Sequence, residues 1–383
     1  MVTVRNPLNG AVVPTLRTGP AALVSSAQVQ RPPPWACLLR PGLLSPTRTS
    51  LRMTATTTPY AELAAPSTAR RLLTAPTTGP LVALLLACVF FAVSTDQFLT
   101  GGNFSLIVQQ VMVVGTLAIG QTLIILTAGI DLSCGAVMAF GSIVIAKMAA
   151  EGSLPPLLAI ALGLVICGGF GLINGLLVQK IPLPPFIVTL GMLNVASALT
   201  HIYSKEQTVT SLPGPLTALG QTFPLGHTDI TYGSLVTIAL FLLLAYALSS
   251  TGWGRHVYAL GNSQEAARLN GIRTSRLTIG IYTVAGLLYG IAALLLISRT
   301  GVGDPQAGQT DNLDSITAVV LGGTSLFGGR GSVLGTFIGV LIVGVFRNGL
   351  QLMGVASVYQ TLITGVLVIL AVTVDQISRK RAR

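Results

Sequence analysis

Long apolar runs separated by short polar loops fill the chain from residue 80 onward, and they constrain the fold more than any other feature. Several of these runs reach the roughly 20 residues that a helix needs to cross a bilayer. The whole chain is 51% hydrophobic and only 9% charged, whereas about 25% of the residues in a soluble domain are charged. Because a soluble fold could not bury so much apolar surface, the sequence predicts an all-α, polytopic membrane protein.

The apolar runs define a transmembrane domain over residues 80–376 with about ten helices. The longest loop on one side then covers residues 203–231, and the longest loop on the other side covers residues 251–276. No soluble catalytic domain fits between the spans. The expected spans cover residues 80–95, 104–126, 135–150, 157–178, 186–202, 232–250, 277–298, 313–329, 332–349 and 358–374.

Basic residues are unevenly divided between the two sides of this topology. Beyond the first 52 residues, placing the N-terminus inside puts twelve Lys and Arg residues on the cytoplasmic side and four outside. This excess follows the positive-inside rule and favours an inner-membrane protein with both termini in the cytoplasm. The net charge of +11 therefore does not indicate a nucleic-acid-binding face. The cytoplasmic residues are Arg70, Arg71, Lys180, Arg255, Arg268, Arg273, Arg276, Arg330, Arg379, Lys380, Arg381 and Arg383, and the outer residues are Lys147, Lys205, Arg299 and Arg347.

The two ends of the chain lack apolar periodicity. Residues 1–79 are rich in Pro, Thr, Ser and Arg, and they contain no compact hydrophobic segment of a signal peptide. We expect a disordered leader, in which residues 1–52 are either an upstream extension before a start at Met53 or a genuine cytoplasmic tail. At the other end, residues 377–383 form a basic cytoplasmic tail.

Motifs for catalysis, nucleotide binding and metal binding are missing from the sequence. No GxxxxGK[ST] phosphate-binding loop occurs, and the four cysteines are too isolated to indicate a metal site or a disulfide framework. We therefore expect no catalytic residues, no metal and no cofactor in this chain. If transport uses ATP, and Mg²⁺ with it, a separate subunit must hydrolyse the nucleotide.

The largest cytoplasmic loop contains a short segment with helix signals at both ends. Asn262 and Glu265 have the spacing of a capping box, and Asn270-Gly271 is typical of a left-handed helix stop. The residues between them are good helix formers, so we expect a two-turn helix over 262–271 outside the membrane. Because so short a helix is marginal in water, it needs a groove in this chain or in a partner.

The same segment resembles the EAA loop of ABC importer permeases, which docks into the ATPase subunit. The resemblance rests on three consecutive letters, on the following glycine and on the position in the largest cytoplasmic loop. A simple surface connector is the alternative. The residues expected to couple this chain to an ATPase are Gly261, Asn262, Glu265, Ala266, Ala267, Arg268 and Gly271.

Further segments, in matching order over about residues 80–380, resemble the permeases of ribose-type ABC importers, whose superfamily also contains branched-chain amino acid permeases. The resemblance implies an ABC importer permease fold that works as a homodimer, or in some cases a heterodimer, with two ATPase subunits beneath it. It also implies a periplasmic or lipid-anchored sugar-binding protein above it, and ATP-driven import of a monosaccharide such as ribose. The segments are 120–133 (GQTLIILTAGIDLS), 173–177 (INGLL), 184–191 (PPFIVTLG), 258–262 (YALGN), 313–325 (LDSITAVVLGGTS) and 328–332 (GGRGS).

Polar residues in or beside the apolar spans are candidates for the translocation path. Asp131 follows a hydrophobic run, and a carboxylate at membrane depth costs about 2.5–3.5 kcal/mol unless it faces protein or water. Asp131 either caps the next span together with Ser133 or lines the path. Gln121 and Asn174 are suited to interhelical hydrogen bonds or to substrate contact. The full set of path candidates is Gln121, Asp131, Ser133, Asn174 and Asp314.

The glycine-rich run 322–331 lacks the lysine of a nucleotide-binding loop, so we expect it to break helices or pack them tightly. Gly331, Gly335 and Gly339 continue the run at the spacing of close helix contacts. That spacing suits either a dimer interface or the core of one chain.

An ion-coupled secondary transporter is the alternative from a different class. Such proteins usually need ionisable groups deep in the membrane, and Asp131 is the one acidic residue placed to serve. Within the ABC class, permeases for branched-chain amino acids or nucleosides are the alternative, although residues 130–133 favour sugars.

Overall fold

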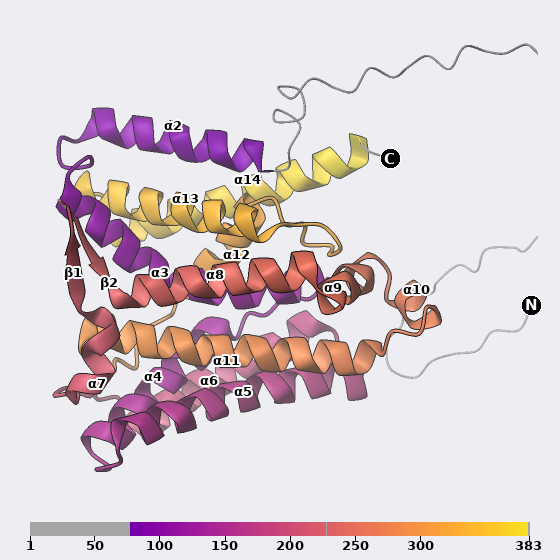
Figure 1. The fold of residues 1–383 in the computed structure, drawn as a ribbon, viewed down its shortest axis with the longest axis horizontal. Coiled ribbons are helices and arrows are strands. Elements are labelled where there is room, and N and C mark those ends of the chain that lie inside the picture. Colours follow the sequence, from indigo (N-terminus) through magenta and orange to yellow (C-terminus); the bar gives the residue numbers. More distant parts are fainter. Residues whose placement is uncertain (1–76, 227, 382–383) are drawn as a thin grey trace, which may run out of the picture. The chain divides into compact units, whose positions relative to one another are not determined.

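The computed structural model describes residues 77–226 and 228–381, which are mostly helical (Figure 1). The predicted leader lies outside the described residues up to residue 76, as do the last two residues of the predicted basic tail. In the described part, six helices are long and apolar enough to cross a membrane: α3 (Gly101–Leu126), α5 (Pro156–Lys180), α6 (Pro185–Ser204), α8 (Tyr232–Ser250), α11 (Thr274–Thr300) and α13 (Val333–Leu352). The remaining long elements are α2 (Thr78–Ser94), α4 (Cys134–Ala150), α12 (Asp311–Leu321) and α14 (Ser357–Arg381).

The helix α11 packs against α5, α3 and α4. Glycines let the backbones of α11 and α5 approach closely. A Cβ atom added at Gly171 would lie 2.1 Å from the carbonyl oxygen of Tyr282, and one added at Gly286 would lie 2.4 Å from that of Cys167. Larger residues do not fit at either position unless a helix moves. Membrane helices typically use glycine in this way to pack closely. This close packing fixes α11, whose side chains reach the polar residues described below.

The prediction of a span over residues 313–329 is wrong. The helix α12 ends at Leu321, and the chain then turns through residues 322–332 before α13 begins. Several glycines in this turn have positive φ, a conformation that is disfavoured for residues with a Cβ atom. The glycine-rich run therefore breaks the helix, as expected, and it leaves α12 only 11 residues long.

The helix α13 packs directly on the backbone of α12. A Cβ atom at Gly335 would lie 2.1 Å from the carbonyl oxygen of Gly322, and one at Gly339 would lie 1.9 Å from that of Ala318. The small-residue spacing that begins at Gly331 therefore serves a contact within one chain.

The loop 203–231 contains a β-hairpin, so the all-α expectation needs a correction. Strand β1 (Thr222–Leu225) pairs antiparallel with β2 (Thr228–Thr231), after the single turns α7 (Gly214–Thr217) and η1 (Ala218–Gly220). Strands of four residues offer too short an alternating pattern to be separated from a loop by sequence. The hairpin lies at the opposite end of α8 from the next helix, α9 (Figure 1).

The loop 251–276 contains two helices rather than one: α9 (Gly252–Asn262) and α10 (Gln264–Leu269). The predicted capping box of Asn262 and Glu265 is wrong. Asn262 still belongs to α9, and the extended residue Ser263 is the N-cap of α10, where its Oγ accepts a hydrogen bond of 3.2 Å from a first-turn amide. The predicted helix stop is confirmed, because the chain leaves α10 through Gly271 with φ of +82°.

Candidate functional site

A buried polar cluster occupies the break between α3 and α4. One carboxylate oxygen of Asp131 accepts hydrogen bonds from the backbone amide and the hydroxyl of Ser133, at 2.8 and 2.6 Å. The other oxygen accepts a hydrogen bond of 3.1 Å from the hydroxyl of Tyr289 in α11. Because Ser133 directly precedes α4, Asp131 fixes the entry of the chain into that helix. Among the described residues, Asp131 thus contacts the N-cap residue of α4 and no first-turn amide of that helix, and the Ser133 side chain makes no capping hydrogen bond to it, so the choice between capping and lining the path stays open.

Gln121 of α3 and Asn174 of α5 belong to the same cluster. The amide nitrogen of Asn174 donates to the hydroxyl of Ser133 at 3.1 Å, and that of Gln121 donates to the backbone carbonyl of Asp131. Each of these four predicted path residues is at most 1% exposed, so in this conformation they bind one another and are closed to solvent. Tyr289 was not predicted as a site residue, because nothing around it in the sequence separates it from other buried aromatic residues.

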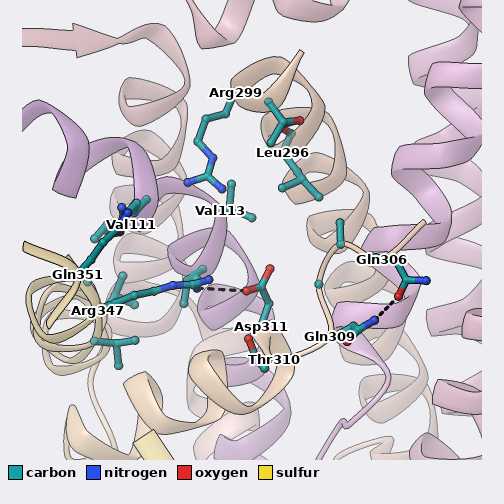
Figure 2. A pocket seen from close by; sticks show the side chains of 18 residues that line it. Val111, Val113, Leu296, Arg299, Gln306, Gln309, Thr310, Asp311, Arg347 and Gln351 are labelled. Atoms are coloured by element: carbon teal, nitrogen blue, oxygen red, sulfur yellow. Dashed lines mark hydrogen bonds and ion pairs between the residues drawn. The ribbon is translucent and has the colours of Figure 1, made fainter. Parts of the chain in front are cut away.

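Asp314, the fifth predicted path residue, lies apart from this cluster and next to Arg347 of α13. The guanidinium of Arg347 is 3.3 Å from the carboxylate of Asp314 and 3.6 Å from that of Asp311. Arg299, at the end of α11, points toward the same place (Figure 2). The carboxylate side chains are only 8% and 13% exposed, whereas the Arg347 side chain is 48% exposed. This ion-pair cluster was not predictable from the sequence, since its members come from three separate helices.

The ion-pair cluster borders a cavity of about 520 Å³ between α3, α11, α12 and α13, which we call the outer cavity (Figure 2). Its lining combines the charged groups and aliphatic side chains, such as Val111 and Leu296, with uncharged polar groups. Where the chain approaches α12, the amide of Gln309 donates a hydrogen bond to that of Gln306 (Figure 2). The uncharged polar residues are Gln110, Thr300, Gln306, Gln309, Thr310 and Gln351.

A second cavity, of about 240 Å³, adjoins the outer cavity through the shared residues 307–309. Ser197, Thr200 and His201 of α6 line it, and Asn194 lies on the exposed part of the same helix. Polar groups at membrane depth normally face protein or water rather than lipid. The repeated polar residues inside this otherwise apolar span were a usable signal that the sequence analysis did not follow.

The helix α10 lies at the opposite end of the helices from the β-hairpin (Figure 1). Glu265, Ala266 and Arg268 are exposed on it, while Ala267 is 3% exposed and packs against the chain. Leu269, which the sequence analysis missed, has 79% of its surface exposed. This short helix therefore presents charged and apolar side chains side by side.

Three predicted coupling residues remain: Gly271 is exposed in the turn after α10, whereas Gly261 and Asn262 lie at the end of α9. Gly261 and Asn262 border a cavity of about 550 Å³ between α9, α11 and the turn that joins α5 to α6. Within residues 77–226 and 228–381, no group of three or more His, Cys, Asp or Glu residues is placed to hold a metal ion.

Polar groups enclosed by apolar helices are characteristic of proteins that move solutes across membranes. The six long apolar helices define a multi-pass membrane protein, and the enclosed polar groups are typical of those that transport solutes. The family model described as "Branched-chain amino acid transport system / permease component" matches residues 103–372. Since this match covers most of the chain, the protein belongs to that permease family.

Three relatives are similar to this chain over most of their own length. The fructose import permease protein of Rhizobium meliloti is 45% identical over 313 residues, which cover 80% of this chain and 87% of the relative. The ribose import permease protein of Bacillus subtilis (strain 168) is 41% identical over 300 residues, 78% of this chain and 92% of the relative. The D-allose transport system permease protein of Escherichia coli (strain K12) is 32% identical over 296 residues, 77% and 90% respectively.

Proposed function

We propose that this chain is the membrane-spanning permease of an ATP-binding-cassette importer that brings a monosaccharide into the cytoplasm. The observation that carries the proposal is similarity, over more than three quarters of the chain, to permeases named for fructose, ribose and allose. The description of the family mentions branched-chain amino acids. The individual relatives are sugar permeases, and they favour a sugar as the substrate.

The chemistry of the outer cavity supports a neutral polyol. Amide and hydroxyl groups suit sugar hydroxyls, and the aliphatic residues suit the C–H faces of a sugar ring. The two arginines, Arg299 and Arg347, balance the two carboxylates, Asp311 and Asp314, so the ion-pair cluster carries no net charge for a charged substrate to bind. We assign the outer cavity to sugar entry. We assign to the cluster around Asp131 the role of holding the break between α3 and α4 closed in this conformation.

Energy comes from a separate ATPase subunit, which binds ATP and Mg²⁺, because this sequence has no phosphate-binding loop. We assign docking of that subunit to α10, on which Glu265, Ala266, Arg268 and Leu269 are exposed. A periplasmic or lipid-anchored sugar-binding protein delivers substrate to the opposite side. Two copies of this chain form the permease as a homodimer.

The proposed topology has about ten crossings: the six long apolar helices, α2, α4, α14, and a tenth formed by α12 together with the non-helical residues 301–310 before it, because α12 alone is too short to cross. Both termini are cytoplasmic in this topology. The distribution of basic residues supports the orientation, because the cytoplasmic excess required by the positive-inside rule falls at the end that carries α10. Basic residues at that end are Lys180, Arg255, Arg268, Arg273 and Arg276.

Competition between substrates tests the proposed function. Cells that express this permease with its ATPase and binding protein are given labelled fructose or ribose, and cells lacking only the permease are the control. We expect permease-dependent uptake that unlabelled fructose, ribose, allose or xylose reduces and that leucine or a nucleoside leaves unchanged. Permease-dependent uptake of leucine without any uptake of sugar would contradict the proposal and favour the amino acid alternative.

A further inference from the structure

Three separate backbone segments meet through glycines at the end of α3. The amide of Gly329, in the turn between α12 and α13, donates a hydrogen bond of 2.9 Å to the carbonyl oxygen of Leu126, the last residue of α3. Gly261, near the end of α9, packs against both of these residues. We call the contact formed by Gly261, Gly328 and Gly329 the glycine junction.

The glycine junction has no room for a side chain. A Cβ atom at Gly261 would lie 1.8 Å from the carbonyl oxygen of Leu126 and 2.5 Å from the amide nitrogen of Gly329. At Gly328 it would lie 2.7 Å from the amide nitrogen of Ala128. Real Cβ atoms essentially never approach other atoms more closely than 3.0 Å, so each substitution must push backbones apart. Peptide groups are planar and have no rotamers, so they cannot rearrange to absorb a shift. When one backbone segment of such a contact moves, the other therefore moves with it.

On one side, the glycine junction leads to the proposed docking segment. The helix α9 continues through Ser263 directly into α10. A second contact ties α9 to the same turn, because the hydroxyl of Tyr258 donates a hydrogen bond of 3.0 Å to the carbonyl oxygen of Gly331. A displacement of α10 therefore reaches the turn between α12 and α13 at two points.

On the other side, the glycine junction leads to the elements that border the polar cluster and the outer cavity. The helix α3, which ends at Leu126, carries Gln121 and its hydrogen bond to the break at Asp131. The turn holds the end of α12, and at the start of that helix Asn312 donates a hydrogen bond of 3.2 Å to the carbonyl oxygen of Leu132. The glycine junction is thus continuous with both sides of the break between α3 and α4.

We infer that the glycine junction passes movement of α9 and α10 to α3 and α12, and that Gly261 is a positioning residue for transport. The inference rests on the proposed function, since it concerns how ATP hydrolysis elsewhere opens the path in this chain. The observation behind the inference is the contiguous backbone contact at Gly261, and the experiment below tests whether a change at this contact alters transport.

The test compares Gly261→Ala with Gly280→Ala in the complete complex of permease, ATPase and binding protein in proteoliposomes. Gly280 is a matched control, because it is helical and a Cβ atom there would meet nothing within 4 Å. Co-purification of the ATPase, ATP hydrolysis and sugar import are measured for each complex. We expect Gly261→Ala to retain the ATPase and hydrolyse ATP while importing at least about fivefold less sugar per ATP, the lower end of typical allosteric couplings. Gly280→Ala should match the wild type.

If Gly261→Ala imports as much sugar per ATP hydrolysed as the wild type, the inference is overturned. The same holds if less ATPase co-purifies with Gly261→Ala but the remaining complex imports a wild-type amount of sugar per ATP. In both cases Gly261 would serve packing alone. If Gly261→Ala does not fold, Tyr258→Phe decides, since it removes only the hydrogen bond to Gly331 and adds no atoms. That variant should lower the ratio by about twofold, and an unchanged ratio would refute the inference. Failure of the wild-type complex to import any sugar with ATP would instead contradict the proposed function.

Discussion

Replacing Asp131 with alanine should destabilise the protein, because its carboxylate accepts three hydrogen bonds inside the buried cluster. Two come from Ser133, at 2.8 and 2.6 Å, and one comes from Tyr289, at 3.1 Å. The alanine variant leaves three buried donors without an acceptor. Such interactions average about 0.6 kcal/mol in membrane proteins, whereas an unsatisfied buried donor costs about 1–3 kcal/mol. For three donors, the expected loss in free energy of unfolding therefore lies between about 2 and about 9 kcal/mol.

The assay heats the purified permease in detergent and measures the monodisperse fraction by size-exclusion chromatography. Asp131→Asn keeps an oxygen for Ser133, and Tyr289→Phe removes a single hydrogen bond, so both should lose less stability than Asp131→Ala. The reasoning is refuted if Asp131→Ala is as stable as the wild type but transports no sugar. Asp131 would then act in the path rather than hold the break between α3 and α4.

Four other perturbations have defined outcomes. Gly271→Val forces a β-branched residue to φ of +82°, at a cost of about 1–2 kcal/mol or more. Less ATPase should therefore co-purify with this variant. Gly280→Val is the control without positive φ and should retain the ATPase. Arg347→Ala removes the cation that is ion-paired with two mostly buried carboxylates, so the KM for sugar uptake should rise. Arg347→Lys should bring the KM part of the way back to the wild-type value. An unchanged KM in Arg347→Ala would show that this group is not part of the entry site. A chain that starts at Met53 should transport like the full chain at equal membrane abundance, and a clear loss would show that the leader functions. Cysteine placed at Gly226 should react with an impermeant reagent added outside intact cells, whereas labelling only after permeabilisation would reverse the topology.

The apolar spans were predictable because length and composition alone identify membrane helices. The expected span 104–126 became α3, Gly101–Leu126, and the expected span 232–250 coincides with α8, Tyr232–Ser250. Hydropathy could not show that α12 stops at Leu321, since the residues after it are also largely small and apolar. The deciding information was the conformation of the glycines.

Local signals gave part of the α10 region and missed the rest. The stop at Gly271 follows from the conformational freedom of glycine and could be predicted from its neighbours. Asn262 and Ser263 are both good N-cap residues, so the spacing to Glu265 favoured the wrong one. Placing the cap required knowing that α9 continues through Asn262.

The polar sites were less predictable than the fold, because they assemble residues from distant segments. Gln121, Asp131 and Asn174 were identified as polar residues in apolar surroundings, but their hydrogen bonds depend on how α3 and α5 are placed around the break before α4. Arg299 and Arg347 were counted only as outer basic residues. Their position beside the outer cavity follows from tertiary packing, which no spacing along the chain encodes.

ATP-dependent sugar import by purified components is the decisive measurement for the proposed function. The permease, its ATPase and its binding protein are reconstituted in proteoliposomes, and uptake of labelled sugar is measured with Mg²⁺ and ATP on the ATPase side. A parallel sample receives a proton or sodium gradient and no ATP. The account predicts uptake that requires ATP and the binding protein, that vanadate stops and that a protonophore does not change. Uptake driven by the ion gradient in the absence of the ATPase would contradict it.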